Sequence, residues 1–242
     1  MKNPLKIIID FIFPAACPVC AALVTEHGML CATCWGAFNW ISDPKCYCCG
    51  YPFPANLDLG PRPLCPFCAA DESELDWMRA AAVYDDVSRN IMLPFKHAAA
   101  LKYRDIMVRA MISALHEIGD QQPVDTVMPI PLAYRRLFKR GYNQAALLAR
   151  PIAKHLGVPM DVSSVRRKHK PDMGHMNYKQ RHANIRGVFK VIRSERIRGK
   201  VILLVDDVMT TGATFSEMRR VLKRAGAVAV YGVVFCRTVK AI

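Results

Sequence analysis

The cysteines are the residues of this 242-residue chain whose type and spacing most clearly indicate chemistry. Eight of the ten form four pairs with two residues between the thiols: Cys17 and Cys20, Cys31 and Cys34, Cys46 and Cys49, and Cys65 and Cys68. Two intervening residues let one tight turn direct both sulfurs at a single ion, and two such turns complete a tetrahedral sulfur site. The spacing therefore predicts one or two zinc ions.

The grouping of these pairs is open at the level of sequence. A sequential grouping places the first two pairs on one ion and the last two on another, whereas a cross-braced grouping joins the first pair to the third. Disulfides and an iron–sulfur cluster are the alternatives, and a reducing compartment disfavours the disulfides. Eight thiolates fill two closed sites without leaving a position for water or substrate, so the predicted zinc is structural. Cys48 and Cys236 remain unassigned.

A second chemically suggestive group lies near the C-terminus. Two carboxylates follow an apolar run and precede a loop of small and hydroxylated residues, in the order Asp206, Asp207, Thr210, Thr211, Gly212, Ala213 and Thr214. A tight loop with inward N–H groups at the start of a helix favours an anion such as a monophosphate. Adjacent carboxylates accept hydrogen bonds from a vicinal diol or approach a divalent metal. Together they predict a ribose 5-phosphate site.

The elements around this loop alternate between strands and helices. Apolar runs predict strands at 80–84, 126–129, 201–205 and 228–236, and helical spacing predicts helices over 88–96, 106–118, 143–156 and 215–225. This alternation predicts an α/β fold with a mainly parallel sheet and helices on both faces. Ligands of such sheets bind beyond the carboxyl ends of strands, which is where residues 206–214 fall.

Composition divides the chain near residue 75. Nine of the ten cysteines lie within 17–68, so residues 1–75 are predicted to form an N-terminal helix and a double zinc-binding module that relies on metal for its folding energy. An acidic stretch at 71–76 closes this module, and residues 76–242 are predicted to form the α/β domain. The apolar N-terminal run is too short for a membrane span, and the absence of an export signal predicts a cytoplasmic location.

Charge is distributed unevenly over a formal net charge of +14. Residues 1–90 carry 6 basic and 10 acidic side chains, whereas residues 135–200 alone carry 18 basic and 3 acidic ones. The positive electrostatic field of this basic stretch suits an anionic partner such as a polyphosphate, a nucleic acid or an anionic membrane. A solvated basic face is the competing interpretation.

The sequence of residues 201–214, VILLVDDVMTTGAT, resembles the phosphoribosyl pyrophosphate (PRPP) motif of type I phosphoribosyltransferases. The wider order of motifs is more specific: the cysteine pairs, then PIPL at 129–132, RGYNQ at 140–144, Arg181-x-x-Asn184, Gly187-x-Phe189 and the PRPP motif. This order resembles the ComF family of competence-linked, amidophosphoribosyltransferase-like proteins over nearly the whole chain. The resemblance implies a type I phosphoribosyltransferase fold behind a zinc module.

The resemblance also implies roles for individual residues. Asp206 and Asp207, the catalytic carboxylates, would contact the ribose hydroxyls of PRPP with Mg²⁺, and the 210–214 loop would hold the 5-phosphate. The implied pyrophosphate and lid residues are Pro131, Leu132, Arg135, Arg136, Arg140, Asn143, Gln144 and Arg181. Residues 166–184 correspond to a mobile basic loop that covers the substrate. Met173 stands where many members carry Gln, so any substrate contact of that Gln is missing here.

Two hypotheses of function follow. In the first, the chain binds PRPP with Mg²⁺, transfers phosphoribosyl groups to an unidentified nucleophile and takes part in DNA uptake. In the second, it is a non-catalytic accessory factor of natural transformation, in which the basic stretch binds single-stranded DNA and the zinc module docks a helicase. The two hypotheses are compatible, and the resemblance to the ComF family favours both.

Overall fold

The computed structural model describes residues 13–70, 77–97, 100–116, 123–168 and 178–239. Its elements in chain order are α2 (Ala32–Ala37), α3 (Pro66–Ala70), β1 (Trp77–Val83), α4 (Asp86–His97), η1 (Leu101–Tyr103), α5 (Arg104–Leu115), β2 (Thr126–Pro129), α6 (Tyr134–Arg140), α7 (Gln144–Leu156), β3 (Val165–Arg167), α8 (Tyr178–Ile185), β4 (Phe189–Val191), η3 (Ser194–Arg196), β5 (Val201–Met209), α9 (Ala213–Arg224) and β6 (Ala229–Arg237). The predicted N-terminal helix, the acidic stretch at 71–76 and Met173 lie outside the described residues.

Four strands form the central sheet in the order β1-β6-β5-β2, and each neighbouring pair is parallel. The inner strands β5 and β6 are buried along nearly their whole length, as their continuous apolar runs require of strands covered on both faces. The two short strands β3 and β4 pair antiparallel outside this sheet. The predicted parallel α/β architecture is confirmed.

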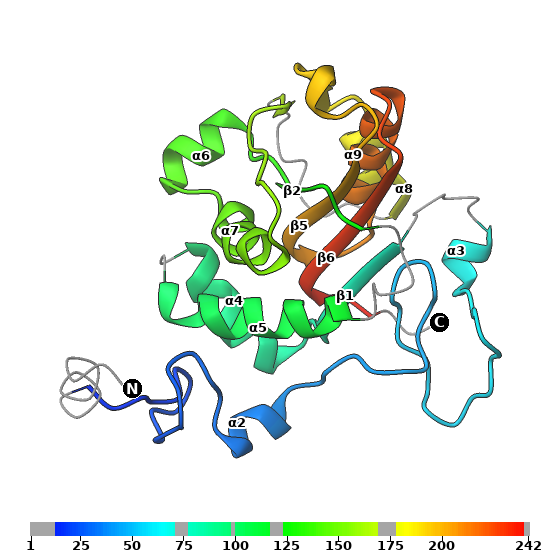
Figure 1. The fold of residues 1–242 in the computed structure, drawn as a ribbon. Helices are drawn as coiled ribbons and strands as arrows, with labels where there is room; N and C mark the ends of the chain where they lie inside the picture. Colours follow the sequence, from blue (N-terminus) through cyan, green and yellow to red (C-terminus); the bar gives the residue numbers. More distant parts are fainter. Residues whose placement is uncertain (1–12, 71–76, 98–99, 117–122, 169–177, 240–242) are drawn as a thin grey trace.

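Helices cover both faces of the sheet. Side chains alternate along β5, so Leu203 and Val205 enter one apolar core while Ile202 and Leu204 enter the other. Helices α4, α5 and α7 supply the first core, and α9 supplies the second from the opposite face (Figure 1). The sheet is therefore held rigidly between two helical layers, with the ends of its strands left to carry loops.

Two element boundaries near the predicted phosphate loop differ from expectation. Strand β5 continues to Met209 rather than ending at Val205, because its pairing with β6 extends through the polar residues as far as Arg237. Helix α9 begins at Ala213, two residues earlier than predicted. The connection between them is therefore only three residues long, and Asp206 and Asp207 lie within the end of the strand.

The cysteine-rich segment covers the free edge of β1. The Val83 N–H donates to the Asn39 carbonyl at 2.9 Å, and the Met78 N–H donates to the Cys48 carbonyl at 2.9 Å. Gly50 has a φ of 65°, and a Cβ there would lie 2.9 Å from the Met78 carbonyl oxygen, so this approach needs glycine. These contacts satisfy an edge that would otherwise expose unpaired backbone groups. The division of the chain at residue 75 stays a prediction.

Candidate ribose-phosphate site and zinc centres

The connection from β5 to α9 has the form predicted for an anion-binding loop. Residues Thr210 and Thr211 follow the strand, and Gly212 adopts a left-handed φ of 77° immediately before the twelve-residue helix. The Thr211 hydroxyl accepts a hydrogen bond from the Ala213 N–H at 3.4 Å. The first N–H groups of a helix lack intrahelical partners and point toward its N-terminus, where the helix dipole favours negative charge. Ala213 and Thr214 occupy these first helical positions.

The two carboxylates at the end of β5 lie in different surroundings. Asp207 is 3% exposed, and its Oδ1 accepts a hydrogen bond from the Val208 N–H at 2.9 Å. Its buried Oδ2 makes no hydrogen bond to any described residue, which leaves an acceptor available to a hydroxyl or a cation. Asp206 is partly buried and accepts from the Asp207 N–H at 2.9 Å.

The protonation of Asp206 is shifted by these surroundings. Burial raises the pKa of its carboxyl well above the usual 3.8, and the neighbouring Asp207 charge acts in the same direction. The Lys96 ammonium, contributed by α4, lowers this pKa in part. Sequence reasoning missed Lys96, because the topology alone brings the end of α4 near β5. A nearby cation or hydrogen-bond donor would stabilise the ionised form of this carboxyl.

The RGYNQ residues join the start of α7 to the loop after β2. The Asn143 carboxamide oxygen caps α7 by accepting from the Ala145 N–H at 3.0 Å, and its Nδ2 donates to the Ile130 carbonyl at 3.1 Å. The Ile130 N–H in turn donates to the Val205 carbonyl at 2.9 Å, directly before Asp206. The loop that begins at Pro131 and the carboxylates of β5 therefore lie at the same edge of the sheet.

Other members of the motif also have structural partners. Arg140 donates to the side chain of the buried Gln144 at 2.8 Å, and the Tyr142 hydroxyl donates to the Phe95 carbonyl at 2.7 Å. Gly141 ends α6 in a left-handed conformation, with φ of 78°. The hydrogen bonds of this motif thus connect α6, α7 and α4, a structural linkage that the motif's sequence did not reveal.

The remaining predicted site residues are spread more widely. Pro131 and Leu132 are half-buried in the loop after β2, and Arg135 and Arg136 are exposed on α6. Arg181 lies on α8, and the middle of the predicted covering loop, residues 169–177, lies outside the described residues. The structure accordingly brings Pro131 and Leu132 to the edge that carries Asp206.

The eight paired cysteines form two clusters with the sequential grouping. The first contains Cys17, Cys20, Cys31 and Cys34, the second contains Cys46, Cys49, Cys65 and Cys68, and the sulfurs within each lie within 4.8 Å of one another. The Cys20–Cys31 and Cys49–Cys65 sulfur distances are 3.5 and 3.6 Å. Tetrahedral zinc with bonds of about 2.3 Å separates its sulfurs by about 3.8 Å, so both clusters fit a structural zinc ion.

The pKa shifts of the thiols in the second cluster also favour a bound zinc ion. Hydrogen bonds with Cys49, Cys65 and Cys68 lower the pKa of the Cys46 thiol, and burial opposes them only in part. Hydrogen bonds with Cys46, Cys48, Cys49 and Cys65 raise the pKa of the Cys68 thiol. Four adjacent thiols cannot all ionise without a cation among them, because each new thiolate repels the others. The Cys49 and Cys65 N–H groups also donate to the Cys46 sulfur at 3.5 and 3.3 Å, as suits a thiolate ligand.

Arg237, which sequence reasoning did not single out, connects the second cluster to the sheet. It is buried at the end of β6, and its guanidinium donates to the Cys49 backbone carbonyl and to the Cys49 sulfur. The next residue, Thr238, donates its N–H to the Met209 carbonyl at 2.9 Å and its hydroxyl to the Thr210 carbonyl at 3.1 Å. The second zinc centre and the candidate phosphate loop therefore share one short segment.

The chain combines a cysteine-rich part similar to a double zinc ribbon with a parallel α/β part similar to a phosphoribosyl transferase domain. Residues 8–69 match the family model of the double zinc ribbon domain, and residues 143–240 match that of the phosphoribosyl transferase domain. A crystal structure of adenine phosphoribosyltransferase aligns with 60% of this chain and 74% of that chain, at 17% identity and a TM-score of 0.39.

More particularly, the chain is similar to ComF-like DNA utilization proteins over most of its length. DNA utilization protein YhgH of Salmonella typhimurium is 28% identical over 223 residues, which cover 92% of this chain and 90% of that protein. Competence protein F of Haemophilus influenzae is 33% identical over 104 residues, which cover 42% of this chain and 45% of that protein. The ComF resemblance predicted from the motifs is confirmed.

No helix in the described part of the chain combines the length and the apolarity that crossing a bilayer requires.

Proposed function

We propose that this protein binds PRPP, or a related ribose 5-phosphate, at the junction of β5 and α9. The observation that carries the proposal is the placement of Asp206 and Asp207 near the end of a buried parallel strand, which a three-residue loop joins to a helix N-terminus. The loop amides and the hydroxyls of Thr210, Thr211 and Thr214 suit a monophosphate. The orphaned Asp207 Oδ2 suits a ribose hydroxyl or a cation.

Mg²⁺ fits the same carboxylates, because carboxylate oxygens are the ligands it prefers. When bound with PRPP, it supplies positive charge that stabilises the departing diphosphate. Asp206 and Asp207 then orient the ribose, the 210–214 loop holds the 5-phosphate, and the basic side chains Arg135 and Arg136 neutralise diphosphate charge beside Pro131. In this proposal the chain transfers the phosphoribosyl group to a nucleophile that attacks C1 of the ribose. The names of the DNA utilization and competence relatives support a part in DNA uptake.

Calorimetric titration of PRPP with Mg²⁺ tests the proposal. The double variant Asp206→Asn/Asp207→Asn keeps the size of both side chains but removes their charge. We expect it to bind PRPP at least tenfold more weakly than the wild type, because charge-assisted hydrogen bonds to the ribose are lost. Equal affinity in the two proteins would end the proposal. Arg150→Gln, an exposed change on α7, serves as the control.

A second candidate function, binding of single-stranded DNA, rests on α6. This helix exposes Tyr134 (77% exposed) and Phe138 (82% exposed), and its other residues include Arg135, Arg136 and Lys139. Bases stack on exposed aromatic rings while cations contact the phosphates, so this combination suits a single strand. Under this hypothesis the zinc module is the part that docks a helicase.

Filter binding of oligodeoxythymidine at low and high salt tests this second function. The variant Tyr134→Ala/Phe138→Ala is expected to lose roughly tenfold in affinity, whereas Phe13→Ala, another exposed aromatic, is expected to lose none. Competition by PRPP would place both ligands on one basic surface. Failure of the wild type to bind at low salt would leave the ribose-phosphate function alone.

A further inference from the structure

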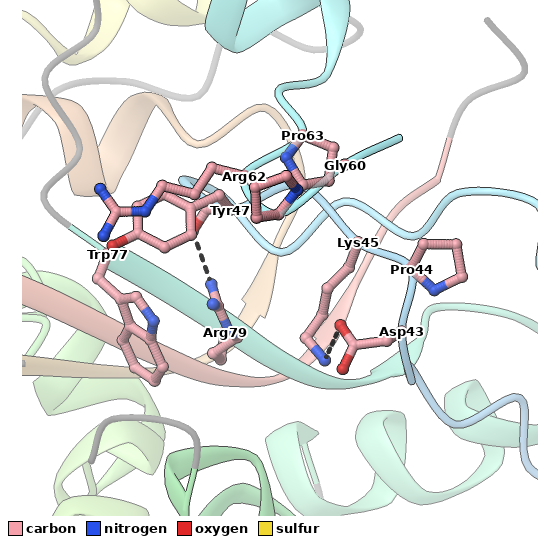
Figure 2. A pocket seen from close by; sticks show the side chains of 10 residues that line it. Asp43, Pro44, Lys45, Tyr47, Gly60, Arg62, Pro63, Trp77 and Arg79 are labelled. Carbon is pink, nitrogen blue, oxygen red and sulfur yellow. Dashed lines mark hydrogen bonds and ion pairs between the residues drawn. The ribbon is translucent and has the colours of Figure 1, made fainter. Parts of the chain in front are cut away.

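The second zinc ribbon, which contains the second sulfur cluster, lies against strand β1 through the turn at residues 46–51. The Arg79 guanidinium on β1 donates to the Tyr47 carbonyl at 3.0 Å (Figure 2). The Met78 N–H donates to the Cys48 carbonyl at 2.9 Å. The turn that supplies two ligands of the second cluster is therefore in direct contact with the sheet.

Arg237 reaches the same turn from β6, the strand next to β1. Its buried guanidinium donates to the Cys49 carbonyl and, at 3.3 Å, to the Cys49 sulfur. The same guanidinium lies over the Tyr51 ring, 5.0 Å from its centroid. Because the donors of a guanidinium have a fixed, planar arrangement, these contacts make the position of Arg237 depend on that of Cys49.

The backbone around Arg237 holds the beginning of the candidate phosphate loop. Arg237 pairs with Met209 in the parallel register of β6 and β5. The Thr238 N–H donates to the Met209 carbonyl at 2.9 Å, and the Thr238 hydroxyl donates to the Thr210 carbonyl at 3.1 Å. Only three residues connect β5 to α9, so a shift of Thr210 changes the directions of the N–H groups that follow it.

Metal ligation fixes the far end of this path. The four sulfurs of the second cluster suit one tetrahedral ion, and the bond lengths to such an ion hold each cysteine in place. The free energy of binding a structural metal is also folding free energy, so a ribbon without metal loses its ordered turn. In the metal-loaded state Arg237 therefore meets both of its Cys49 acceptors at fixed positions, and in the metal-free state both acceptors move together.

The first cluster offers a comparison, because its ribbon contacts a different part of the domain. Glu26, between the two cysteine pairs of this cluster, forms an ion pair with Arg109 of α5 at 3.1 Å. The neighbouring Gly28 packs against Asp105, also on α5. Loss of metal from the first cluster should therefore disturb the surface of α5 rather than the end of β6.

We propose that the metal state of the second cluster sets the geometry of the 210–214 loop and thereby its affinity for an anion. In the metal-loaded state, Arg237 and Thr238 hold Thr210 so that the loop amides converge on one position. Loss of the metal frees the Cys49 contacts, and the loop then binds an anion more weakly. Coupling between two sites is reciprocal, so an anion in the loop also strengthens metal binding at the second cluster. The choice of PRPP as the anion rests on the proposed function, whereas the path through Arg237 does not.

Calorimetric titration of PRPP with Mg²⁺ into the full-length protein compares two variants that each lack one cysteine ligand. Cys68→Ser disrupts the second cluster, and Cys34→Ser disrupts the first and is the matched control. We expect Cys68→Ser to bind PRPP at least about fivefold more weakly than the wild type, and Cys34→Ser to bind it equally well. Equal affinity in Cys68→Ser and the wild type, or equal weakening in both variants, would overturn the proposal.

A further variant tests the path with all zinc ligands in place. Thr238→Val keeps the shape of the side chain but removes the hydroxyl that donates to Thr210. Its matched control, Thr126→Val, removes a hydroxyl that donates to the Pro159 carbonyl at the beginning of β2. Thr238→Val should retain both zinc ions but bind PRPP about threefold or more weakly, whereas Thr126→Val should bind it like the wild type. PRPP should slow removal of the second zinc ion by a chelator in the wild type and less so in Thr238→Val, and equal protection in the two would contradict the proposal.

Hydrogen exchange without any ligand separates this inference from the ribose-phosphate proposal. The Thr238 amide should exchange faster in Cys68→Ser than in the wild type or Cys34→Ser, because its acceptor at Met209 is no longer held in register. Failure of the wild type to bind PRPP would end the ribose-phosphate proposal, and this difference in exchange would still support the path. Equal exchange in Cys68→Ser and the wild type would show that the metal state does not reach the loop, which would overturn the inference alone.

Discussion

The Arg237 guanidinium donates to the backbone carbonyl of Cys49, a residue 188 positions away that belongs to the second sulfur cluster. A hydrogen bond with Cys46 and burial act to raise the pKa of the Cys49 thiol, but hydrogen bonds with Cys65 and Cys68, with a smaller coulombic contribution from the Arg237 guanidinium, lower it to about 6. Through Thr238, the segment that carries Arg237 also holds the start of the candidate phosphate loop. Through these contacts, the second zinc ribbon is connected to the candidate phosphate loop at 210–214.

Replacement of Arg237 is expected to loosen the second zinc centre. Arg237→Lys keeps the charge but cannot reproduce the bonds to both the carbonyl and the sulfur of Cys49. We expect a loss of stability of about 1.5–3 kcal/mol and faster removal of one zinc ion by a chelator. Chelator kinetics with a colorimetric zinc indicator measure the effect. Release of both ions at the wild-type rates would show that the contact has no role in metal retention.

The two clusters are expected to bind one zinc ion each, independently. Cys34→Ser and Cys68→Ser each remove one ligand from a different cluster, so metal analysis of each variant should give one zinc per chain instead of two. Cys48→Ser, which changes a thiol outside both clusters, should keep two. A single variant that lost both ions would show that the two centres do not bind zinc independently.

The bond between Asn143 and the Ile130 carbonyl is expected to be separable from helix capping. Asn143→Ala removes both functions and should cost about 1–2 kcal/mol of stability. Asn143→Asp keeps the capping oxygen but loses the donor to Ile130, so it should retain most of the stability while weakening PRPP binding. Thermal unfolding and PRPP titration of both variants test this. Equal PRPP affinity in Asn143→Asp and the wild type would contradict a positioning role.

Asp206 is expected to lower stability at neutral pH. Its pKa is raised in the folded protein, so the unfolded chain ionises first and stability falls as the pH rises above about 4. Asp206→Asn should therefore unfold at a higher temperature than the wild type at pH 7 without Mg²⁺, and the difference should vanish near pH 3.5. Thermal scans across this pH range provide the measurement. A lower unfolding temperature at pH 7 would show that the charge is stabilised in the fold.

Much of the fold was predictable because its signals are local. The apolar runs of β5 and β6 and the caps Asn143 and Gly157 of α7 mark buried strands and a helix directly. The true end of β5 was not predictable, because Asp206 and Asp207 end the apolar run while pairing with β6 continues to Met209. Helix α6 was missed for a related reason: its cations and exposed aromatics lack a buried apolar face.

The candidate ribose-phosphate site also has local parts that the sequence predicts and long-range contacts that it does not. The order of Asp206, Asp207 and the 210–214 loop predicts a phosphate cradle, because all of its parts lie within nine residues. The contributions of Lys96, Arg237 and Ile130 depend on contacts between distant segments, and no spacing in the sequence reveals such contacts. The hydrogen bond between Arg140 and Gln144 likewise depends on how the end of α6 meets the start of α7.

A crystal structure of the full-length protein with PRPP and Mg²⁺ tests the central claim most directly. We predict the 5-phosphate within hydrogen-bonding distance of the backbone N–H groups at 211–214, and the ribose hydroxyls against Asp206 and Asp207. The diphosphate should lie toward Pro131. PRPP bound with its 5-phosphate away from this loop, or with its ribose away from both carboxylates, would contradict the account.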